Sequence, residues 1–257
     1  TALVTTSGFT DVLPAARAAR PTLYASDWDP APALVSRRDT HTVRQRTTYE
    51  GEVIEDLDEE SLRAIAAKLR EQGTEAVAIN FLHSYINGEH ERRARDILGE
   101  ELPNAYVSIS SDILPEIREF ERTSTTVVNA YLGPVLDRYL SALSERLRDF
   151  GYDGPMLITH SGGGVMSVEA AREIPARICQ SGPAAGVMAG ANLGRATDRQ
   201  NVINLDVGGT SAYVSLARGG RPLIRAGWNS NFNIAINFPS VDVAAIGAGG
   251  GSIAPVG

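Results

Sequence analysis

The sequence has little cysteine and no long apolar run. Cys179 is the single cysteine among 257 residues, so the chain cannot form an intramolecular disulfide, and a reducing, cytoplasmic location is the simplest expectation. No apolar stretch reaches the roughly 18 residues that a membrane-spanning helix needs. The start also lacks the basic and apolar regions of a secretion signal. We therefore expect a protein that does not cross a membrane.

Positive charge is also scarce. The chain carries 24 Lys and Arg against 31 Asp and Glu, a net charge of −7, and its arginines are scattered along predicted helices. Because nucleic-acid backbones require a basic stripe, this balance argues against nucleic-acid binding. For the charged run from Glu116 to Arg122, a solvated helix face is the default interpretation, with a subunit-contact role left open.

Histidine is too sparse and too dispersed to indicate a metal site. No carboxylate stands at a ligand spacing from any histidine, and Ser161 lacks the Gly-x-Ser-x-Gly pattern of a hydrolase nucleophile. We expect ordinary structural or surface roles for all four histidines, which are His41, His83, His90 and His160.

What the sequence does contain is an alternation of strand-like and helical segments, the pattern of an α/β protein. Its clearest helix has apolar residues at Leu62, Ile65, Ala66 and Leu69, with Asp56 and Glu59 spaced as a capping pair and Gly73 as the stop. The other expected elements are a helix over 9–19 that ends before Pro21, strands over 40–49, 76–82 and 106–110, and a helix over 89–101.

A long helical stretch follows over 116–150, and we expect an interruption near Gly133 and Pro134. Its second part places one apolar stripe toward a core, consisting of Leu132, Leu136, Tyr139, Leu140, Leu143 and Leu147. Beyond Gly151 the sequence becomes rich in glycine and its strands become shorter. We place an organisational boundary near residue 120.

The sharpest motif is the segment from Val202 to Leu216, in which a hydrophobic strand delivers Asp206 to a tight turn before a second strand. Gly208 and Gly209 allow a phosphate to approach the main chain, and the turn's amides can form an anion-binding concavity. Thr210 and Ser211 add hydroxyl donors, and Asp206 suits a Mg²⁺ ion held directly or through water. A plain Gly-Gly hairpin is the alternative.

Upstream of this motif, the segment 180–191 is a turn that feeds a helix made almost entirely of small residues. Such a helix can approach another element closely, and a tightly packed core helix explains it equally well. In the actin/Hsp70/hexokinase superfamily, a small-residue helix of this kind precedes the second phosphate-binding turn, and the order and spacing here resemble that scheme.

Several blocks in order along the chain resemble the hydantoinase A/5-oxoprolinase family. They lie at 3–13, 81–85, 114–134, 162–167 and 241–253. The resemblance implies an α/β fold of the actin/hexokinase (ribonuclease H-like) kind, with mixed sheets and flanking helices. It assigns residues 1–120 to the rest of the family's N-terminal region and 121–257 to the start of the hydantoinase A core.

By the same resemblance, relatives use ATP and Mg²⁺ to activate a cyclic amide, such as hydantoin or 5-oxoproline, or a ketone for carboxylation. They work with a B-type subunit, so an oligomer is expected. Asp206 would serve as a catalytic and metal-binding carboxylate. The remaining site residues would bind the nucleotide, namely Gly208, Gly209, Thr210, Ser211, Gly249, Gly250, Gly251 and Ser252.

Two departures from the family pattern keep alternatives open. The family begins with another Asp-x-Gly-Gly-Thr turn that is absent here, as expected of an internal fragment, and Tyr213 stands where the family usually has an aspartate. The first hypothesis is that the chain is part of the A subunit of an ATP-dependent cyclic-amide hydrolase and is inactive as this fragment alone. The second is the nucleotide-binding subunit of an acetone- or acetophenone-type carboxylase. The third is a degenerate, non-catalytic scaffold.

Overall fold

The structure of the chain is a computed structural model, and it describes residues 1–19, 22, 24, 27, 29, 32–231 and 234–253. The chain forms two compact units. The first comprises Thr1–Asp153, Arg172–Ala176 and Asn229–Asn237, and the second comprises Gly154–Ala171, Arg177–Trp228 and Phe238–Gly257. None of the helices in the described ranges has the length and apolar character to cross a lipid bilayer.

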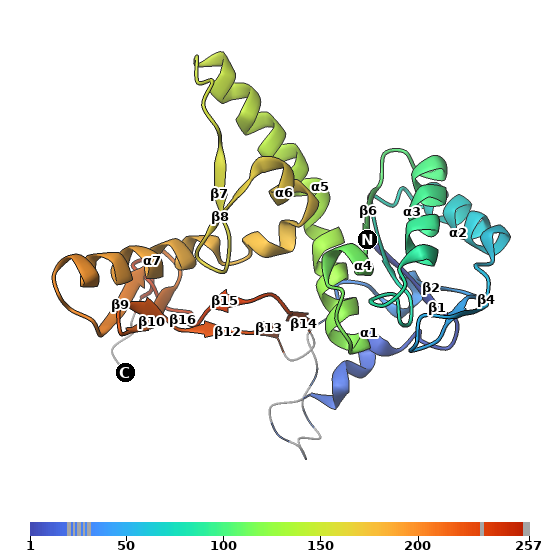
Figure 1. Cartoon of the computed structure of the whole chain (residues 1–257), viewed down its shortest axis with the longest axis horizontal. Coiled ribbons are helices and arrows are strands. Elements are labelled where there is room, and N and C mark those ends of the chain that lie inside the picture. The colour runs from blue at the N-terminus through green and yellow to red at the C-terminus, as the bar shows by residue number, and fades with distance from the viewer. Residues whose placement is uncertain are drawn as a thin grey trace. The chain divides into compact units, whose positions relative to one another are not determined.

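The first unit is built on a four-stranded parallel sheet with the strand order β2-β1-β5-β6 (Figure 1). Its strands are β1 (Ala2–Thr6), β2 (Thr40–Val43), β5 (Ala76–Asn80) and β6 (Tyr106–Ile109), with the short pairs β3 (Arg46–Thr47) and β4 (Val53–Glu55), and β13 (Trp228–Asn231) and β14 (Ile234–Ile236). Its α-helices are α1 (Val12–Ala15), α2 (Glu59–Glu71), α3 (Glu89–Glu101), α4 (Ser110–Ile113) and α5 (Glu119–Asp149). Two single 3-10 turns, η1 (Ala16–Ala18) and η2 (Arg37–Asp39), complete it.

Both faces of this sheet are covered, which explains why β5 is buried along its whole length. On one face, Val77 and Ile79 pack with the apolar residues of α2 and α3. On the other face, Ala76 and Ala78 pack with α5 through Phe120. The two alanines leave room for the α5 backbone close to the strand, since their side chains extend only one carbon from the sheet.

The predicted elements of this unit are largely present, with corrections at their ends. The helix over 89–101 is confirmed, and the strand predicted over 76–82 is present but ends at Asn80. The cap of α2 is Asp58, whose side chain accepts a hydrogen bond from the Ser61 amide, so the predicted pairing of Asp56 with Glu59 was wrong. The predicted helix over 9–19 is only the short α1 and η1, and Pro21 lies outside the described residues.

The predicted interruption of the long helix was also wrong. α5 runs unbroken from Glu119 to Asp149 with Pro134 inside it. Gly133 packs so tightly against the Tyr106 ring that a Cβ there would lie 2.3 Å from ring carbons. Tertiary packing of the first half of α5 therefore outweighs the hydrogen bond that the proline removes. Of the predicted apolar stripe, Leu140 is buried, whereas Tyr139 is 59% exposed.

The second unit combines antiparallel sheets with one long helix, α7 (Ser181–Ala196). Its main sheet has β10 paired on one side with β9 and on the other with β16, and β11 continues from β10. The strands are β7 (Leu157–Thr159), β8 (Val165–Ser167), β9 (Val202–Val207), β10 (Ala212–Arg218), β11 (Arg221–Pro222), β12 (Ile224–Arg225), β15 (Ser240–Val241) and β16 (Val243–Ile246). The short helices α6 (Val168–Glu173) and η3 (Pro175–Ile178) each span a point where the chain passes from one unit to the other.

The small-residue helix predicted upstream of the Asp206 motif is α7, and it lies along β9 (Figure 1). Its glycines repeat every four residues, which places them on one stripe. A Cβ on Gly186 would meet the Asp206 carboxylate at 3.3 Å, and one on Gly190 would meet the Asn204 side chain at 2.6 Å. The glycines therefore set the close approach of helix and strand.

Candidate functional site: a glycine-lined turn

The Asp206 motif forms the hairpin that the sequence predicts. β9 and β10 are antiparallel, with Val207 opposite Ala212. The turn between them is closed by a hydrogen bond of 2.9 Å from the Gly208 amide to the Ser211 carbonyl oxygen. Its four residues, from Gly208 to Ser211, stand at the end of the sheet.

The second glycine-rich segment lies directly against this turn. The Gly250 amide donates to the Gly208 carbonyl oxygen and the Gly251 amide donates to the Gly209 carbonyl oxygen, both at 2.9 Å. A Cβ on Gly249 would lie 2.5 Å from the Gly208 carbonyl oxygen, so no side chain fits there. The Gly208–Ser211 turn and the Gly249–Ser252 segment, about 40 residues apart in sequence, thus pack backbone against backbone in one layer.

Ser252 closes the second segment on itself. Its hydroxyl accepts a hydrogen bond from the Gly249 amide, and its own amide donates to the Gly249 carbonyl oxygen, both at 2.9 Å. The structure therefore brings together all eight of the nucleotide-binding residues that the sequence predicts. Whether they bind a nucleotide remains a prediction.

Three consecutive amides of the turn are available for a ligand. Within the described part of the chain, the amides of Gly209, Thr210 and Ser211 have no hydrogen-bond acceptor. Gly209 and Thr210 are exposed, and no described residue lies within 4 Å of a Cβ placed on Gly209. Successive free amides in a turn make a concavity of positive partial charge, which suits an anion such as a phosphate.

Asp206 lies at the edge of this layer. Val202, Asn204 and Asp206 alternate along β9 on the face that packs against α7. Among the described residues, the Asp206 carboxylate has no ion pair or hydrogen-bond donor, although it is half-buried. A carboxylate without a protein partner is free to take a cation.

Tyr213 stands directly opposite Asp206 in the register of the two strands. Its ring packs against the apolar cluster formed by Ala184, Val187, Val241 and Val243. An aspartate at this position, as the family pattern usually has, would instead place a second carboxylate across from Asp206. The tyrosine therefore replaces a charge near the turn with apolar packing.

The donor set fits a magnesium ion better than a transition metal. No group of three or more His, Cys, Asp or Glu side chains gathers anywhere in the described ranges. Mg²⁺ requires fewer protein ligands, because it commonly binds one or two carboxylates and completes its shell with water and phosphate oxygens. Burial raises the pKa of the Cys179 thiol to about 11, so this thiol is protonated at neutral pH.

His160 has a structural role, as the sequence suggests. Its Nδ1 accepts a hydrogen bond of 3.0 Å from the Gly162 amide, and its ring fills the space beside Gly162 and Gly164. Burial, and then the nearby Arg177 charge, hold the pKa of His160 below its ordinary value. The imidazole therefore supports the turn after β7 as a neutral group.

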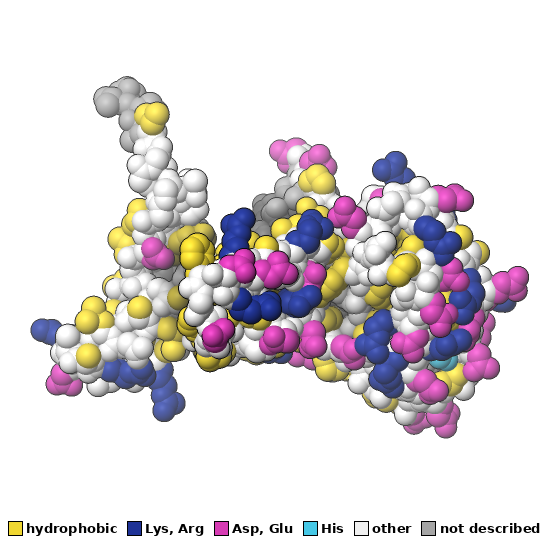
Figure 2. Space-filling model, turned by 90° about the horizontal axis from the view of Figure 1, so that it is seen from above, with side chains coloured by type: hydrophobic (Ala, Val, Ile, Leu, Met, Phe, Trp, Pro, Cys, Tyr) yellow, Lys and Arg dark blue, Asp and Glu magenta, His cyan; other side chains and the backbone are white. Residues whose placement is uncertain are grey.

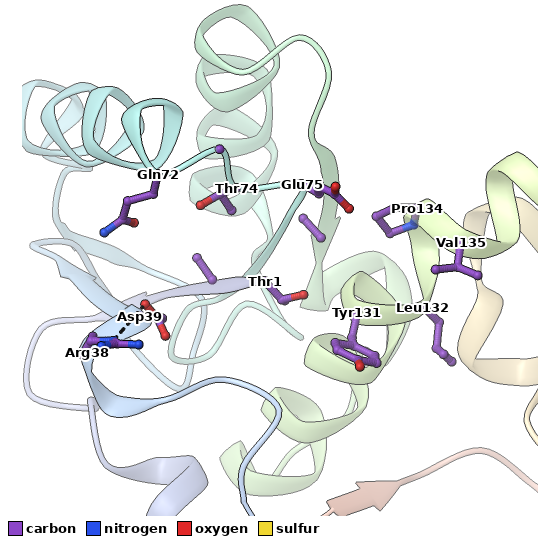
Figure 3. Close-up of a pocket in the computed structure, with 13 residues that line it drawn as sticks. Thr1, Arg38, Asp39, Gln72, Thr74, Glu75, Tyr131, Leu132, Pro134 and Val135 are labelled. Carbon is purple, nitrogen blue, oxygen red and sulfur yellow. Dashed lines mark ion pairs between the residues drawn. The ribbon is translucent and has the colours of Figure 1, made fainter.

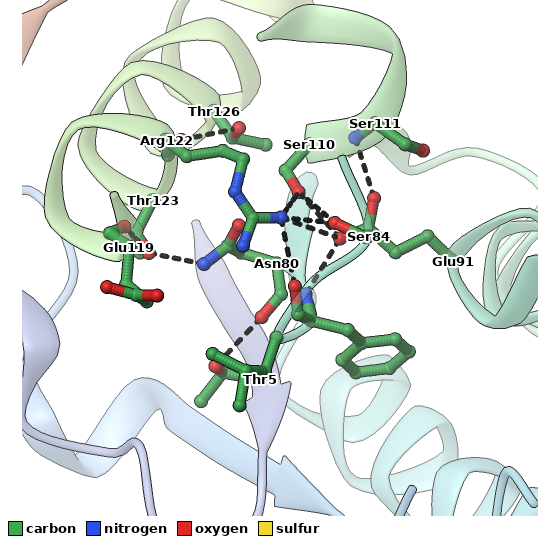
Figure 4. A network of polar contacts seen from close by, with 12 residues as sticks. Thr5, Asn80, Ser84, Glu91, Ser110, Ser111, Glu119, Arg122, Thr123 and Thr126 are labelled. Atoms are coloured by element: carbon green, nitrogen blue, oxygen red, sulfur yellow. Dashed lines mark hydrogen bonds and ion pairs between the residues drawn. The ribbon is translucent and has the colours of Figure 1, made fainter. Parts of the chain in front are cut away.

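A buried polar network in the first unit was not predicted from the sequence (Figure 4). Arg122 is 1% exposed and Glu91 is fully buried, with their charged groups 4.0 Å apart. Glu91 accepts hydrogen bonds from the Phe81 amide and from Ser110. The charged run ending at Arg122 is thus not a solvated helix face, because its last residues turn inward to the carboxyl ends of the parallel strands.

One hollow of about 810 Å³ opens on the first unit (Figure 3). It is lined by Thr1, Arg38, Asp39, Thr74, Glu75 and Tyr131 among others. These residues lie at the amino ends of β1 and β5, opposite to the end where ligands of parallel sheets bind. None of the predicted site residues lines it.

On the face shown in Figure 2, Lys and Arg side chains are interspersed with Asp and Glu side chains. Some exposed ion pairs join neighbouring elements, such as the pair of Arg93 with Glu59, which joins α3 to α2 at 2.6 Å. Exposed pairs of this kind contribute little to stability.

The chain matches two family models that together cover most of its length. Residues 122–257 match the family model described as Hydantoinase/oxoprolinase, and residues 1–102 match its N-terminal region. The chain belongs to the hydantoinase/oxoprolinase family. The resemblance drawn from the sequence is therefore confirmed.

Two solved structures share the fold of this family member. A crystal structure of ATP-dependent caprolactamase from Pseudomonas jessenii superposes with a TM-score of 0.85 at 35% identity, covering 100% of this chain and 37% of that one. The nucleotide-free structure of acetone carboxylase, from work on ATP-dependent acetone carboxylation, also superposes with a TM-score of 0.85, at 31% identity. That match covers 96% of this chain and 36% of the acetone carboxylase chain. The predicted α/β, actin/hexokinase-like fold class is confirmed.

In sequence, the alpha subunit of caprolactamase from Pseudomonas jessenii is 37% identical over 232 residues. That match covers 90% of this chain and 33% of the relative, so the chain spans about a third of the length of this relative. Family members of this kind are subunits of ATP-dependent amide hydrolases and ketone carboxylases.

Proposed function

We propose that this chain is the nucleotide-binding part of an enzyme subunit that uses ATP to activate the carbonyl group of a cyclic amide. One observation supports this most directly. The Gly208–Ser211 turn and the Gly249–Ser252 segment meet through main-chain hydrogen bonds and leave three turn amides free. The lactam hydrolysis named for the Pseudomonas jessenii relative supports the choice of substrate class.

Each part of the site has a distinct task in this proposal. The amides of Gly209, Thr210 and Ser211, with the two hydroxyl groups, bind phosphate oxygens. Asp206 holds Mg²⁺ directly or through water. The Gly249–Ser252 segment lies against the turn, and a Cβ on Gly249 would collide with the Gly208 carbonyl oxygen, so the close approach requires glycine at this position. ATP supplies the phosphoryl group that makes an amide carbonyl reactive.

A B-type subunit is the proposed partner. The caprolactamase relative is named as an alpha subunit, which supports an assembly of more than one kind of chain. We propose that the partner completes the reaction after the carbonyl has been activated.

The first test measures nucleotide binding. Titration calorimetry of the full-length protein with Mg-ATP should give a saturable signal, and Asp206→Asn should weaken binding about 10- to 100-fold, because it removes a charged ligand of the metal. Asp198→Asn, a change at an exposed aspartate just after α7, is the matched control and should have no effect. Wild-type affinity in Asp206→Asn would contradict the assigned role of this carboxylate.

The second test measures turnover. The full-length protein with its B-type partner should hydrolyse ATP only when a cyclic amide such as hydantoin, 5-oxoproline or caprolactam is present. Product analysis should show ring opening in proportion to the ADP formed. No ATP consumption with any of these compounds would count against a cyclic-amide hydrolase.

A ketone carboxylase is the second candidate, and the acetone carboxylase structure favours it, because the TM-score of 0.85 equals that of caprolactamase. In both candidates, the proposal assigns phosphate binding to the same turn, Gly208–Ser211. ATP hydrolysis that requires a ketone and bicarbonate together would separate this candidate from the first.

A non-catalytic scaffold is the third candidate, and Tyr213 favours it. Its ring fills the position opposite Asp206 where a second carboxylate would help to hold a metal. Tight binding of Mg-ATP to the full-length protein would exclude a scaffold that has lost its nucleotide site.

A further inference from the structure

The main sheet of the second unit has one face that is both apolar and exposed. Side chains alternate between the two faces of a strand, and along β9 the side chains that point away from α7 are Ile203, Leu205 and Val207. Their exposed fractions are 74%, 64% and 56%. A single exposed aliphatic residue is ordinary, whereas a contiguous row of them indicates a surface that another element covers.

The strand registers join this row to the neighbouring strands. Residues directly opposite one another in an antiparallel pair lie on the same face of the sheet. We call the face away from α7 the outer face, and its large side chains are Ile203, Leu205, Val207, Val214, Leu216 and Ile246. The apolar patch therefore extends over β9, β10 and β16.

The inner face shows that this sheet belongs between two layers. On that side, Tyr213 of β10 packs with Val187 of α7, although Asn204 and Asp206 lie beside the same helix. A sheet covered by one layer only would present polar side chains on its outer face. Figure 1 shows α7 on one side of these strands, and no helix of the second unit within the described ranges lies on the other.

The first unit shows the arrangement that such a sheet requires. Its strand β5 is buried along its whole length, because α2 and α3 cover one face and α5 covers the other. Helices are the elements that cover both faces of a sheet in α/β proteins. An amphipathic helix is therefore the kind of element that fits the outer face of the second unit.

Two unpaired arginines stand at one end of the outer face. Arg218 and Arg221 lie opposite each other where β10 passes into β11, and both are exposed. Within the described ranges neither one forms an ion pair. Alternation along β10 places Arg218 on the same face as Leu216. Like charges directly opposite each other are unfavourable, so an acidic group on the covering element would be stabilising here.

The length of the family's subunits supplies a covering element. The chain spans about a third of the caprolactamase alpha subunit, and it covers 37% of the caprolactamase chain whose structure is solved. Most of such a subunit therefore lies outside the region that matches residues 1–257. A helix from the same polypeptide has a high effective concentration at this face, because it is covalently attached.

We propose that the outer face is an intramolecular docking surface for an amphipathic helix from the part of the full-length subunit outside residues 1–257. The helix places aliphatic side chains on Leu205 and its neighbours, and it places a carboxylate near Arg218 and Arg221. The sheet that carries the Asp206 turn thereby becomes the middle layer of three.

The test measures thiol accessibility in the full-length protein without nucleotide. Leu205→Cys is treated with a maleimide, and mass spectrometry of its peptides reads the new thiol separately from Cys179. Arg199→Cys, at an exposed position after α7, is the matched control. We expect Leu205→Cys to react at least about 100-fold more slowly than Arg199→Cys, because a covered thiol reacts only in rare open states.

A second substitution and an unsubstituted sample support this measurement. Leu216→Cys, on the neighbouring strand, should be protected like Leu205→Cys. Hydroxyl-radical footprinting of the wild type should show Ile203 and Leu205 oxidised more slowly in the folded protein than in urea. This second measurement needs no variant to fold.

The acidic end of the helix is tested by charge reversal. In the Leu205→Cys background, Arg218→Glu should speed labelling about 3- to 10-fold, because it repels the carboxylate of the docked helix. Arg199→Glu reverses an exposed arginine away from the outer face and should leave the rate unchanged. An unchanged rate in Arg218→Glu would overturn the assignment of an acidic occupant.

Light scattering of the same samples identifies what covers the face. Protection of Leu205→Cys that persists in the isolated monomer supports the inference. Equal labelling of Leu205→Cys and Arg199→Cys in the folded monomer would overturn it. Protection that is lost on dilution to the monomer would show a second copy on this face, and protection that appears only with a B-type subunit would show that partner there. Either result would also overturn the inference.

Discussion

Glu91 is a carboxylate with no exposed surface, and its two oxygens accept three hydrogen bonds. The donors are the Phe81 amide at 2.7 Å, the Ser110 hydroxyl at 2.6 Å and the Ser111 amide at 2.7 Å. The Arg122 guanidinium is 4.0 Å away and donates to the Phe81 carbonyl oxygen. One side chain thus ties together α3, the end of β5 and the start of α4.

Replacing Glu91 should therefore cost far more stability than its size suggests. We expect Glu91→Ala to lower the free energy of unfolding by about 3–5 kcal/mol, because it leaves the buried Arg122 charge without its counter-ion and two amides without acceptors. Glu89→Ala, at an exposed position two residues earlier in the same helix, is the control, and its effect should stay below about 1 kcal/mol. Urea denaturation of both variants measures the difference, and equal losses would contradict the network's role.

α7 owes its position to glycines that face β9. A Cβ on Gly194 would lie 2.5 Å from a Val202 methyl group and 2.7 Å from the Arg199 carbonyl oxygen. The second contact is with the backbone, which cannot move aside as a side chain can. Gly182, at the start of the same helix, has no described atom within 4 Å of a Cβ.

These two glycines give opposite predictions for the same substitution. Gly194→Ala should destabilise the protein by about 1–3 kcal/mol through overpacking. Gly182→Ala should be neutral or stabilising by up to about 1 kcal/mol, because alanine is the better helix former. Thermal unfolding of the two variants provides the measurement, and a stabilised Gly194→Ala would show that α7 can shift away from β9.

At the scale of the whole molecule, histidine protonation should control stability below neutral pH. Burial is the largest cause that lowers the pKa of each of the four histidines, which are His41, His83, His90 and His160. In the unfolded chain these groups take up protons near pH 6.5, whereas the folded chain takes them up only at lower pH. The unfolded state therefore binds more protons between the folded and unfolded pKa values.

Protonation of the histidines therefore destabilises the folded chain. Stability should be highest at neutral pH and should fall as the pH drops from about 7 through the unfolded value near 6.5 toward the folded values. Denaturant midpoints measured between pH 7.5 and 5.5 should decline, and His41→Phe should flatten the decline, because it removes one titrating group. A midpoint that is constant across this range would contradict the prediction.

The local features of the second unit could be predicted from the sequence. The hairpin around Asp206 and the helix α7 both appear where residue type alone indicates them. The reason is that glycine, small residues and alternating apolar residues restrict the backbone over short distances. The family resemblance extended this local pattern to a fold class, which is confirmed.

Other features were decided only by tertiary structure. Pro134 remains inside α5, and Arg122 is buried although its neighbours in sequence are charged. Neither outcome can be derived from local propensity, because each depends on packing with segments tens of residues away. Local residue types determined the Asp206 hairpin and the helix α7. Contacts between distant segments decided that Gly249–Ser252 meets the Asp206 turn, since such proximity depends on the strand order of the sheet.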